Sequence, residues 1–125
     1  MAKIVQLNVL GRKLELCSKN PITGFSRNGC CESHKNDRGQ HNICAVLNDS
    51  FLKYQLSNGN DLITPKLEFN FPGLKSGDKW CVCVNRWIDA YENSCATPVI
   101  LASTHIEVLR MIDLKILKKF AIDLN

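Results

Sequence analysis

The alternation of hydrophobic and polar residues predicts five short strands. Residues 4–9 and 13–17 alternate around a Gly-Arg turn, which is the pattern of a β-hairpin. Residues 43–47 and 79–84 are short apolar runs, and a last run extends from Pro98 to residue 104. Runs of this length between turn signals are typical of strands.

Three further segments have the apolar period of a helix, each after a residue that can cap one. Asn48 or Asp49 precedes the first, Asn85 precedes the second over residues 86–93, and Asp113 precedes a C-terminal stripe. Such side chains accept hydrogen bonds from the free N–H groups of the first helical turn. Strands that alternate with helices after an N-terminal hairpin predict an α+β fold, a small mixed sheet with two or three helices packed on it.

Two long segments show neither the alternation of a strand nor the apolar period of a helix. Residues 18–40 and 58–78 are rich in Gly, Pro, Asn, Asp and Ser, which are typical of turns and loops. Irregular segments of about twenty residues are uncommon in a compact domain unless they have a function or are held by metal. Because no linker or internal repeat separates the elements, we expect residues 1–125 to form a single domain.

Composition narrows the class of protein. The chain has 125 residues, 45% of them hydrophobic, and a formal net charge of +4. So mild a charge, without aromatic residues interleaved with Arg, argues against a nucleic-acid module. Gln6 and Asn8 interrupt the apolar N-terminal run, which argues against a signal peptide, and no stretch approaches the roughly 20 apolar residues of a membrane helix. We therefore expect a cytoplasmic protein that has no membrane partner, and the sequence does not indicate its oligomeric state.

The chain contains seven cysteines. Thiols stay reduced in the cytosol, and an odd number fits poorly with a closed disulfide framework, so we expect thiols or metal ligands. Cys81 and Cys83 alternate within a predicted strand and therefore point to one face, about 7 Å apart. That separation is long for two ligands of one metal ion. Packing in the core is the favoured interpretation, with metal or redox chemistry as the alternative.

The adjacent pair Cys30 and Cys31 is the first candidate for thiol chemistry. The pair lies in a glycine-rich loop, where backbone N–H groups can stabilise a thiolate. The alternative is that one of the two cysteines packs into the core. His41 or His105 could supply a base and Asp61 could orient it, because a Cys–His pair within hydrogen-bond reach suffices for nucleophilic chemistry. The sequence does not decide whether the protein is an enzyme.

A structural zinc site is a second interpretation of the cysteines. Its candidate ligands are Cys17, Cys30, Cys31, His41 and Cys44, since thiolate and imidazole are ligands that Zn²⁺ prefers. However, the spacing does not repeat the two-knuckle pattern of a zinc finger, and His41 and Cys44 face opposite sides of a regular strand. The sequence indicates no other cofactor.

A third interpretation is a binding module whose cysteines are buried and whose two long loops form the surface for a ligand or partner. Asn60 and Thr64 are candidate ligand contacts in the second loop, although Thr64, like Asp61, can also fix the loop through nearby backbone. Arg86 could bind an anion, and Trp87 beside it is expected to anchor the core. A small polar molecule is the ligand that such a pocket would take.

Motifs spread over nearly the whole chain carry a resemblance to a known family. They are Asn8-Val9-Leu10-Gly11, Pro21-x-Thr23-Gly24-Phe25, Asn28-Gly29-Cys30-Cys31, His41-x2-Cys44-Ala45-Val46, Gly59-Asn60-Asp61-Leu62-x-Thr64-Pro65, Phe71-Pro72-Gly73-Leu74, Gly77-Asp78-x-Trp80-Cys81-x-Cys83, Arg86-Trp87 and Thr104-His105. On these residues the chain resembles the domain-of-unknown-function family numbered 2237. The resemblance implies a small, bacterial-type, single-domain protein and assigns no activity to it. Cys17 also matches the family's pattern, whereas His34 and Cys95 lie outside it.

Overall fold

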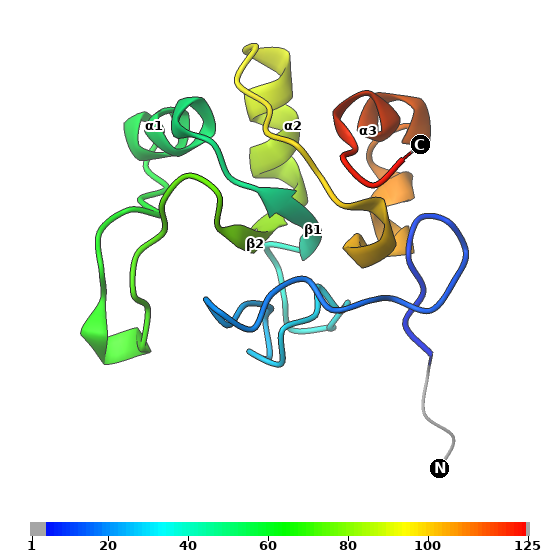
Figure 1. The fold of residues 1–125 in the computed structure, drawn as a ribbon, viewed down its shortest axis with the longest axis horizontal. Coiled ribbons are helices and arrows are strands. Elements are labelled where there is room, and N and C mark those ends of the chain that lie inside the picture. Colours follow the sequence, from blue (N-terminus) through cyan, green and yellow to red (C-terminus); the bar gives the residue numbers. More distant parts are fainter. Residues whose placement is uncertain (1–4, 125) are drawn as a thin grey trace.

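The chain has an α+β architecture, in which helices and an N-terminal loop layer lie on opposite sides of a two-stranded sheet (Figure 1). The computed structural model describes residues 5–124. Strand β1 (His41–Val46) pairs antiparallel with β2 (Lys79–Cys83). We call residues 5–40, which carry no regular helix or strand, the loop layer. The predicted α+β class is confirmed.

Three α-helices lie on the other side of the sheet (Figure 1). They are α1 (Asp49–Ser57), α2 (Val84–Glu92) and α3 (Leu114–Phe120). Short 3₁₀ segments complete the fold: η1 (Leu67–Phe69), η2 (Leu101–Ser103) and η3 (Ile106–Arg110). Within residues 5–124, no helix has both the length and the hydropathy needed to cross a bilayer.

The core lies between the sheet and the helices. Ile43 of β1 and Val82 of β2 are cross-strand partners and face this core, where they pack with Phe51 of α1 and Trp87 of α2. The Trp87 ring is fully buried, and its indole N–H donates to the backbone carbonyl of Thr97 at 3.1 Å. Trp87 therefore has the structural position expected of a core anchor.

Two of the predicted helix caps are confirmed. The Asn48 side chain accepts from the N–H of Phe51 at 2.8 Å, and that of Asp113 accepts from Lys115 at 2.9 Å. The second helix differs from the prediction, because it begins at Val84 directly after β2 and its N-cap residue is Cys83, not Asn85. Strand β2 therefore leads into α2 without a loop.

The strand predicted over residues 98–104 is wrong. Within this segment only Val99 forms β-bridges, antiparallel to Ala45 and parallel to Ala121. The backbones of Pro98 and Ile100 flank it with single hydrogen bonds to Val46 and Cys44 of β1. The chain then turns into η2, and the N–H groups of Leu101 and Ala102 donate to the carboxylate of Asp123 at 2.9 and 3.0 Å. A side chain thus takes the donors that a strand partner would need.

The N-terminal hairpin is reduced to a single antiparallel bridge between Leu7 and Lys13. The turn between them contains Gly11 at a φ of +78°, a backbone conformation that glycine adopts without strain. Residue 4, where the first strand was predicted to begin, lies outside the described residues. Both predicted long loops are irregular, apart from the three residues of η1.

A β-bulge at Asn42 sets which residues of β1 face the loop layer. His41 is the partner of Cys83 and Ile43 is the partner of Val82, so Asn42 is an extra residue in β1 with no partner in β2. An extra residue reverses the alternation of side chains on the strand that contains it. His41 and Cys44, which a regular strand would point to opposite faces, therefore share one.

Candidate functional site

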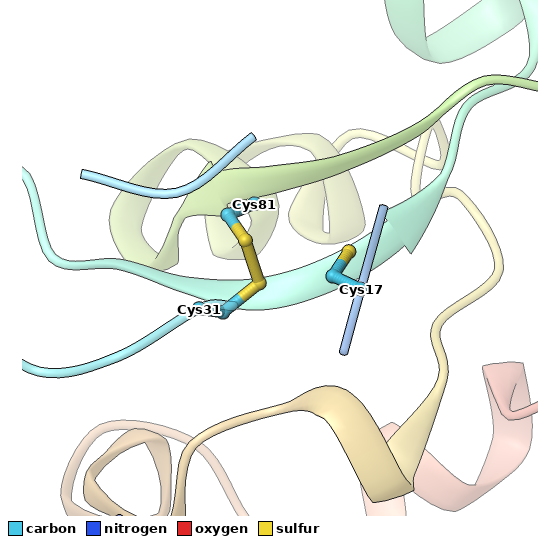
Figure 2. Close-up of side chains that lie close together, drawn as sticks. All are labelled: Cys17, Cys31 and Cys81. Atoms are coloured by element: carbon cyan, nitrogen blue, oxygen red, sulfur yellow. A yellow bond between two sulfur atoms is a disulfide. The ribbon is translucent and has the colours of Figure 1, made fainter. Parts of the chain in front are cut away.

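Four buried cysteines join the loop layer to the sheet. Disulfides link Cys17 to Cys44 and Cys31 to Cys81, and we call these four residues the cysteine cluster. Figure 2 shows the Cys31–Cys81 bond between the loop layer and β2, with Cys17 beside it. The fold brings these four within bonding distance across the layers, so they form disulfides and are not the free thiols that the sequence predicted.

The pairing follows from the sheet and from one close approach in the loop layer. Cys44 and Cys81 are cross-strand partners on the face opposite the main core. In the loop layer, the carbonyl of Gly29 accepts a hydrogen bond from the N–H of Cys17 at 2.7 Å. Gly29 has a φ of +90°, and a Cβ there would lie 2.5 Å from a methyl carbon of Leu16. Glycine adopts this positive φ without strain, and the chain can therefore turn here to bring the two loop segments together.

Three cysteines remain as thiols: Cys30, Cys83 and Cys95. Burial, together with the nearby Glu32 carboxylate, raises the pKa of Cys30. Since the thiolate is the reactive form of cysteine, a raised pKa makes Cys30 a weak nucleophile near neutral pH. Cys31 has no free thiol while it is bonded to Cys81.

Beside the cysteine cluster, a second group of side chains forms a candidate site: Asp37, His41 and Cys83. The bulge at Asn42 places His41 directly opposite Cys83 on the paired strands. A Cβ built on Gly39 would lie 2.8 Å from Cε1 of His41 and 3.1 Å from Sγ of Cys83. The backbone of Gly39 therefore packs against both side chains at once and leaves them side by side.

Asp37 orients the imidazole from the other side. One carboxylate oxygen lies 2.7 Å from Nδ1 of His41, and the other accepts from the backbone N–H of His41 at 2.9 Å. The Asp37 side chain is 1% exposed, so water competes little for these hydrogen bonds. With Nδ1 bound to Asp37, Nε2 is the ring nitrogen left to bind another group.

The two neighbours stabilise the charged form of the imidazole. A hydrogen bond with Cys83 is the largest cause of a rise in the pKa of His41 to about 9, and Asp37 adds to the rise. Burial opposes both effects without cancelling them. His41 is therefore an imidazolium at neutral pH, placed between a buried carboxylate and a thiol.

Cys83 also lies at the N-terminus of α2, as its N-cap residue. The first N–H groups of a helix and the helix dipole stabilise negative charge at this end. The Cys83 side chain is partly exposed. A partly exposed cysteine beside an imidazolium and a helix N-terminus is the environment in which thiols become nucleophilic.

A cavity of about 310 Å³ opens beside His41. Its lining combines aromatic and basic side chains, among them Phe25, Arg27, His41, Lys66, Phe69 and Trp80. The guanidinium of Arg27 lies over the Trp80 ring, 4.9 Å from its centre. Cys81 also lines the cavity, so the disulfide that it forms borders the same space.

Of the predicted catalytic residues, only His41 and Asp61 line this cavity together. The Asp61 carboxylate accepts from the N–H groups of Ile63 and Thr64 at 2.9 and 3.0 Å. Hydrogen bonds from Thr64 hold the pKa of Asp61 below its ordinary value. Asp61 therefore fixes its own loop, and Asp37 is the residue that orients His41.

His105 has a different environment. It is 5% exposed, and its Nε2 lies 2.7 Å from the side-chain oxygen of Gln6. Its Nδ1 accepts from the N–H of Glu107 at 3.0 Å, which caps η3. Burial lowers the pKa of His105. Both ring nitrogens are thus engaged, Nδ1 with η3 and Nε2 with Gln6, and His105 makes no hydrogen bond to a cysteine side chain within residues 5–124.

The predicted ligand contacts Asn60, Thr64, Arg86 and Trp87 do not line the cavity. Asn60 donates to the side chain of Gln55 at 2.9 Å. Arg86 donates to the carbonyl of Asn58 at 3.0 Å, at the end of α1. These contacts tie the end of α1 to the second loop and to α2.

Of the predicted zinc ligands, Cys17, Cys31 and Cys44 meet in the cysteine cluster. Cys30 and His41 are not part of it, and Cys81, which the sequence assigned to core packing, completes it. The sequence missed Asp37 as a functional residue. A regular strand gave no reason to connect residues 37, 41 and 83, and only the bulge at Asn42 does so.

Comparison with known proteins confirms the family resemblance. The sequence profile of the family described as "Uncharacterized protein conserved in bacteria (DUF2237)" matches residues 7–121. No curated protein matches the chain.

Proposed function

We propose that this chain, which belongs to the DUF2237 family, is a thiol-dependent protein in which Cys83 is the nucleophile, His41 the imidazolium that stabilises the Cys83 thiolate and Asp37 the group that orients the imidazole. The observation that carries the proposal is the position of His41, which lies directly opposite Cys83 on the paired strands while its Nδ1 lies 2.7 Å from the buried Asp37 carboxylate. An imidazolium held in one orientation by a buried carboxylate stabilises the thiolate of a neighbouring cysteine.

The residues that line the cavity beside His41 favour a small polar ligand that carries negative charge. Arg27, Lys66 and the imidazolium of His41 line it, and Asp61, the acidic residue among its lining, already accepts hydrogen bonds from its own loop. The remaining lining includes Phe25, Phe69 and Trp80. A ligand with an anionic group and a flat apolar part would satisfy both kinds of side chain.

The cytoplasm is the location that we propose for this protein. Partly exposed free thiols, such as Cys30, Cys83 and Cys95, persist most readily where the surroundings are reducing. The two disulfides of the cysteine cluster are buried, and such bonds resist reduction longer than exposed ones.

A second candidate function is binding without chemistry. Leu67 and Phe69 of η1 are 85% and 67% exposed, and Figure 1 shows η1 projecting away from the helices and the sheet. Exposed apolar side chains beside a cavity are typical of a surface that recognises a partner. If binding is the function, Cys83 has no special reactivity. The reactivity of Cys83 therefore distinguishes the two candidate functions.

Alkylation of the three free thiols tests the first candidate. The folded, non-reduced protein is treated with iodoacetamide at neutral pH, and the rate at each cysteine is read by peptide mass spectrometry. We expect Cys83 to react about tenfold faster than Cys95 or Cys30, because only Cys83 adjoins an imidazolium. His41→Gln should remove that advantage.

His34→Gln is the matched control. His34 is also partly exposed, and its Nε2 lies 2.8 Å from the hydroxyl of Ser26, so its loss removes a histidine without touching Cys83. The control should leave the Cys83 rate unchanged. Equal rates at Cys83 and Cys95 in the unmodified protein would rule out an activated thiol and favour the binding module.

A further inference from the structure

We propose that the cysteine cluster, once its two disulfides are reduced, is a tetrathiolate zinc site. Cys44 lies on β1 and Cys81 on β2, while Cys17 and Cys31 approach from the loop layer (Figure 2). This ligand set differs from the one that the sequence suggested, since it includes Cys81 and excludes Cys30 and His41. The proposal is independent of the chemistry proposed for Cys83.

The positions of the sulfur atoms fit such a site. The Sγ atoms of Cys17, Cys31 and Cys81 lie within 4.8 Å of one another, and Cys44 is bonded to Cys17. Zn–S bonds are about 2.3 Å long, so the sulfurs of a tetrahedral site lie about 3.8 Å apart. The proposed site requires the four side chains to rotate so that two bonded pairs become four ligands around one ion.

The backbone around the four residues is held by contacts that do not involve sulfur. The N–H of Cys81 donates to the hydroxyl of Thr23 at 2.9 Å, and that of Cys44 donates to the hydroxyl of Thr104 at 3.2 Å. Both threonines are fully buried, and a hydrogen bond joins Cys17 to Gly29. Reduction therefore removes the disulfides and leaves the contacts that hold the four thiols together.

Burial also makes the reduced cluster a good environment for a metal. The four cysteines are between 0% and 4% exposed. Thiols are weak hydrogen-bond donors, so four of them packed together gain little from one another. Coordination to zinc replaces these poor contacts with strong bonds and supplies folding energy in place of the lost disulfides.

Reduction of the two disulfides is balanced when one reductant is supplied. A water-soluble trialkylphosphine reduces each disulfide, and one water is consumed to give two thiols and one phosphine oxide. Zinc binding then releases up to four protons as the four thiols become thiolates. Two equivalents of phosphine per chain therefore convert the disulfide form into the metal-binding form.

The experiment is anaerobic reduction with the phosphine, followed by addition of zinc and native mass spectrometry. We expect one zinc per chain in the reduced protein and none in the protein with its disulfides intact. Co²⁺ in place of zinc should give the thiolate-to-metal charge-transfer absorption of a tetrahedral sulfur site. A reduced chain that takes up no zinc, whether folded or unfolded, overturns the proposal.

Two variants show whether zinc binds at the cysteine cluster or elsewhere on the chain. Cys81→Ser removes a ligand and should weaken zinc binding at least tenfold, whereas Cys95→Ser, which removes a thiol outside the cluster, should leave it unchanged. Equal zinc binding by both variants would overturn the proposal, because the metal would then be held elsewhere. Circular dichroism on each zinc-free reduced sample shows whether a loss of binding reflects a loss of fold.

Discussion

Asp37 is the residue on which the orientation of His41 depends. Its carboxylate is buried and both of its oxygens are bound to His41, so the ring cannot turn without breaking a charge-assisted hydrogen bond. Asp37 thus links a turn of the loop layer to the first residue of β1. A single buried acid determines whether the imidazole can act on Cys83.

Asp37→Asn tests this role. The amide cannot supply two charged acceptors, so we expect the pKa of His41 to fall below about 9 and the alkylation of Cys83 to slow. We also expect the free energy of unfolding in urea to decrease by roughly 1–3 kcal/mol. Asp89→Asn is the control, because Asp89 is exposed and binds the hydroxyl of Tyr54. Identical His41 titrations in the two variants would contradict the role of Asp37.

At the scale of elements, the bulge in β1 is the feature that builds the thiol site. Asn42 is the extra residue, and its side-chain amide donates to the carbonyls of Glu32 at 3.1 Å and Cys31 at 3.4 Å. The bulge is therefore anchored to the segment that carries one of the disulfides. The same residue sets the strand register and holds the loop layer against the sheet.

Asn42→Ala should loosen this anchor. The buried carbonyl of Cys31 and the partly buried carbonyl of Glu32 lose their donor, so we expect a loss of roughly 1–3 kcal/mol in the free energy of unfolding, measured in urea. Asn36→Ala, at an exposed position in the same loop, should change the stability by less than about 0.5 kcal/mol. A similar, small effect of both substitutions would mean that the bulge does not depend on its side chain.

The elements that the sequence predicted correctly are those whose signals are local. The caps at Asn48 and Asp113 lie within a few residues of the N–H groups that they bind, and β2 is a continuous apolar run. The incorrect strand depends on Asp123, which lies about twenty residues away and takes the donors of Leu101 and Ala102. No periodicity in residues 98–104 carries that information.

The candidate site shows the same contrast between local and long-range signals. His41 could be selected from its residue type, but its partners come from a turn at Asp37 and from the far strand at Cys83. The disulfide partners of Cys17 and Cys31 lie 27 and 50 residues along the chain. Pairings over such separations are set by the packing of the loop layer on the sheet, which sequence spacing does not specify.

For the whole molecule, the cysteine cluster is the connection between two dissimilar layers. The helical layer has a large apolar core, whereas the loop layer is irregular and is covalently joined to the sheet through the four buried cysteines. Figure 1 shows the sheet between the two layers. The irregular layer therefore depends on cross-links more than the helical layer does.

The double variant Cys17→Ala/Cys44→Ala measures this dependence. Removing a disulfide that closes a loop of this length should cost roughly 2–4 kcal/mol in the free energy of unfolding, measured in urea without reductant or zinc. Cys95→Ala is the control and should cost less than about 1 kcal/mol, since Cys95 has no covalent partner. A double variant as stable as its control would show that packing alone holds the loop layer.

The central claim is that His41 and Cys83 act as one unit, and NMR titration of the His41 ring in the unmodified protein and in Cys83→Ala tests it most directly. We predict a pKa of about 9 for His41 in the unmodified protein. In Cys83→Ala we predict a clear fall toward the ordinary value of about 6.5, because the hydrogen bond that contributes most to the rise is lost. His41→Gln identifies the resonance by its absence. A His41 pKa that is the same with and without Cys83 would contradict the account.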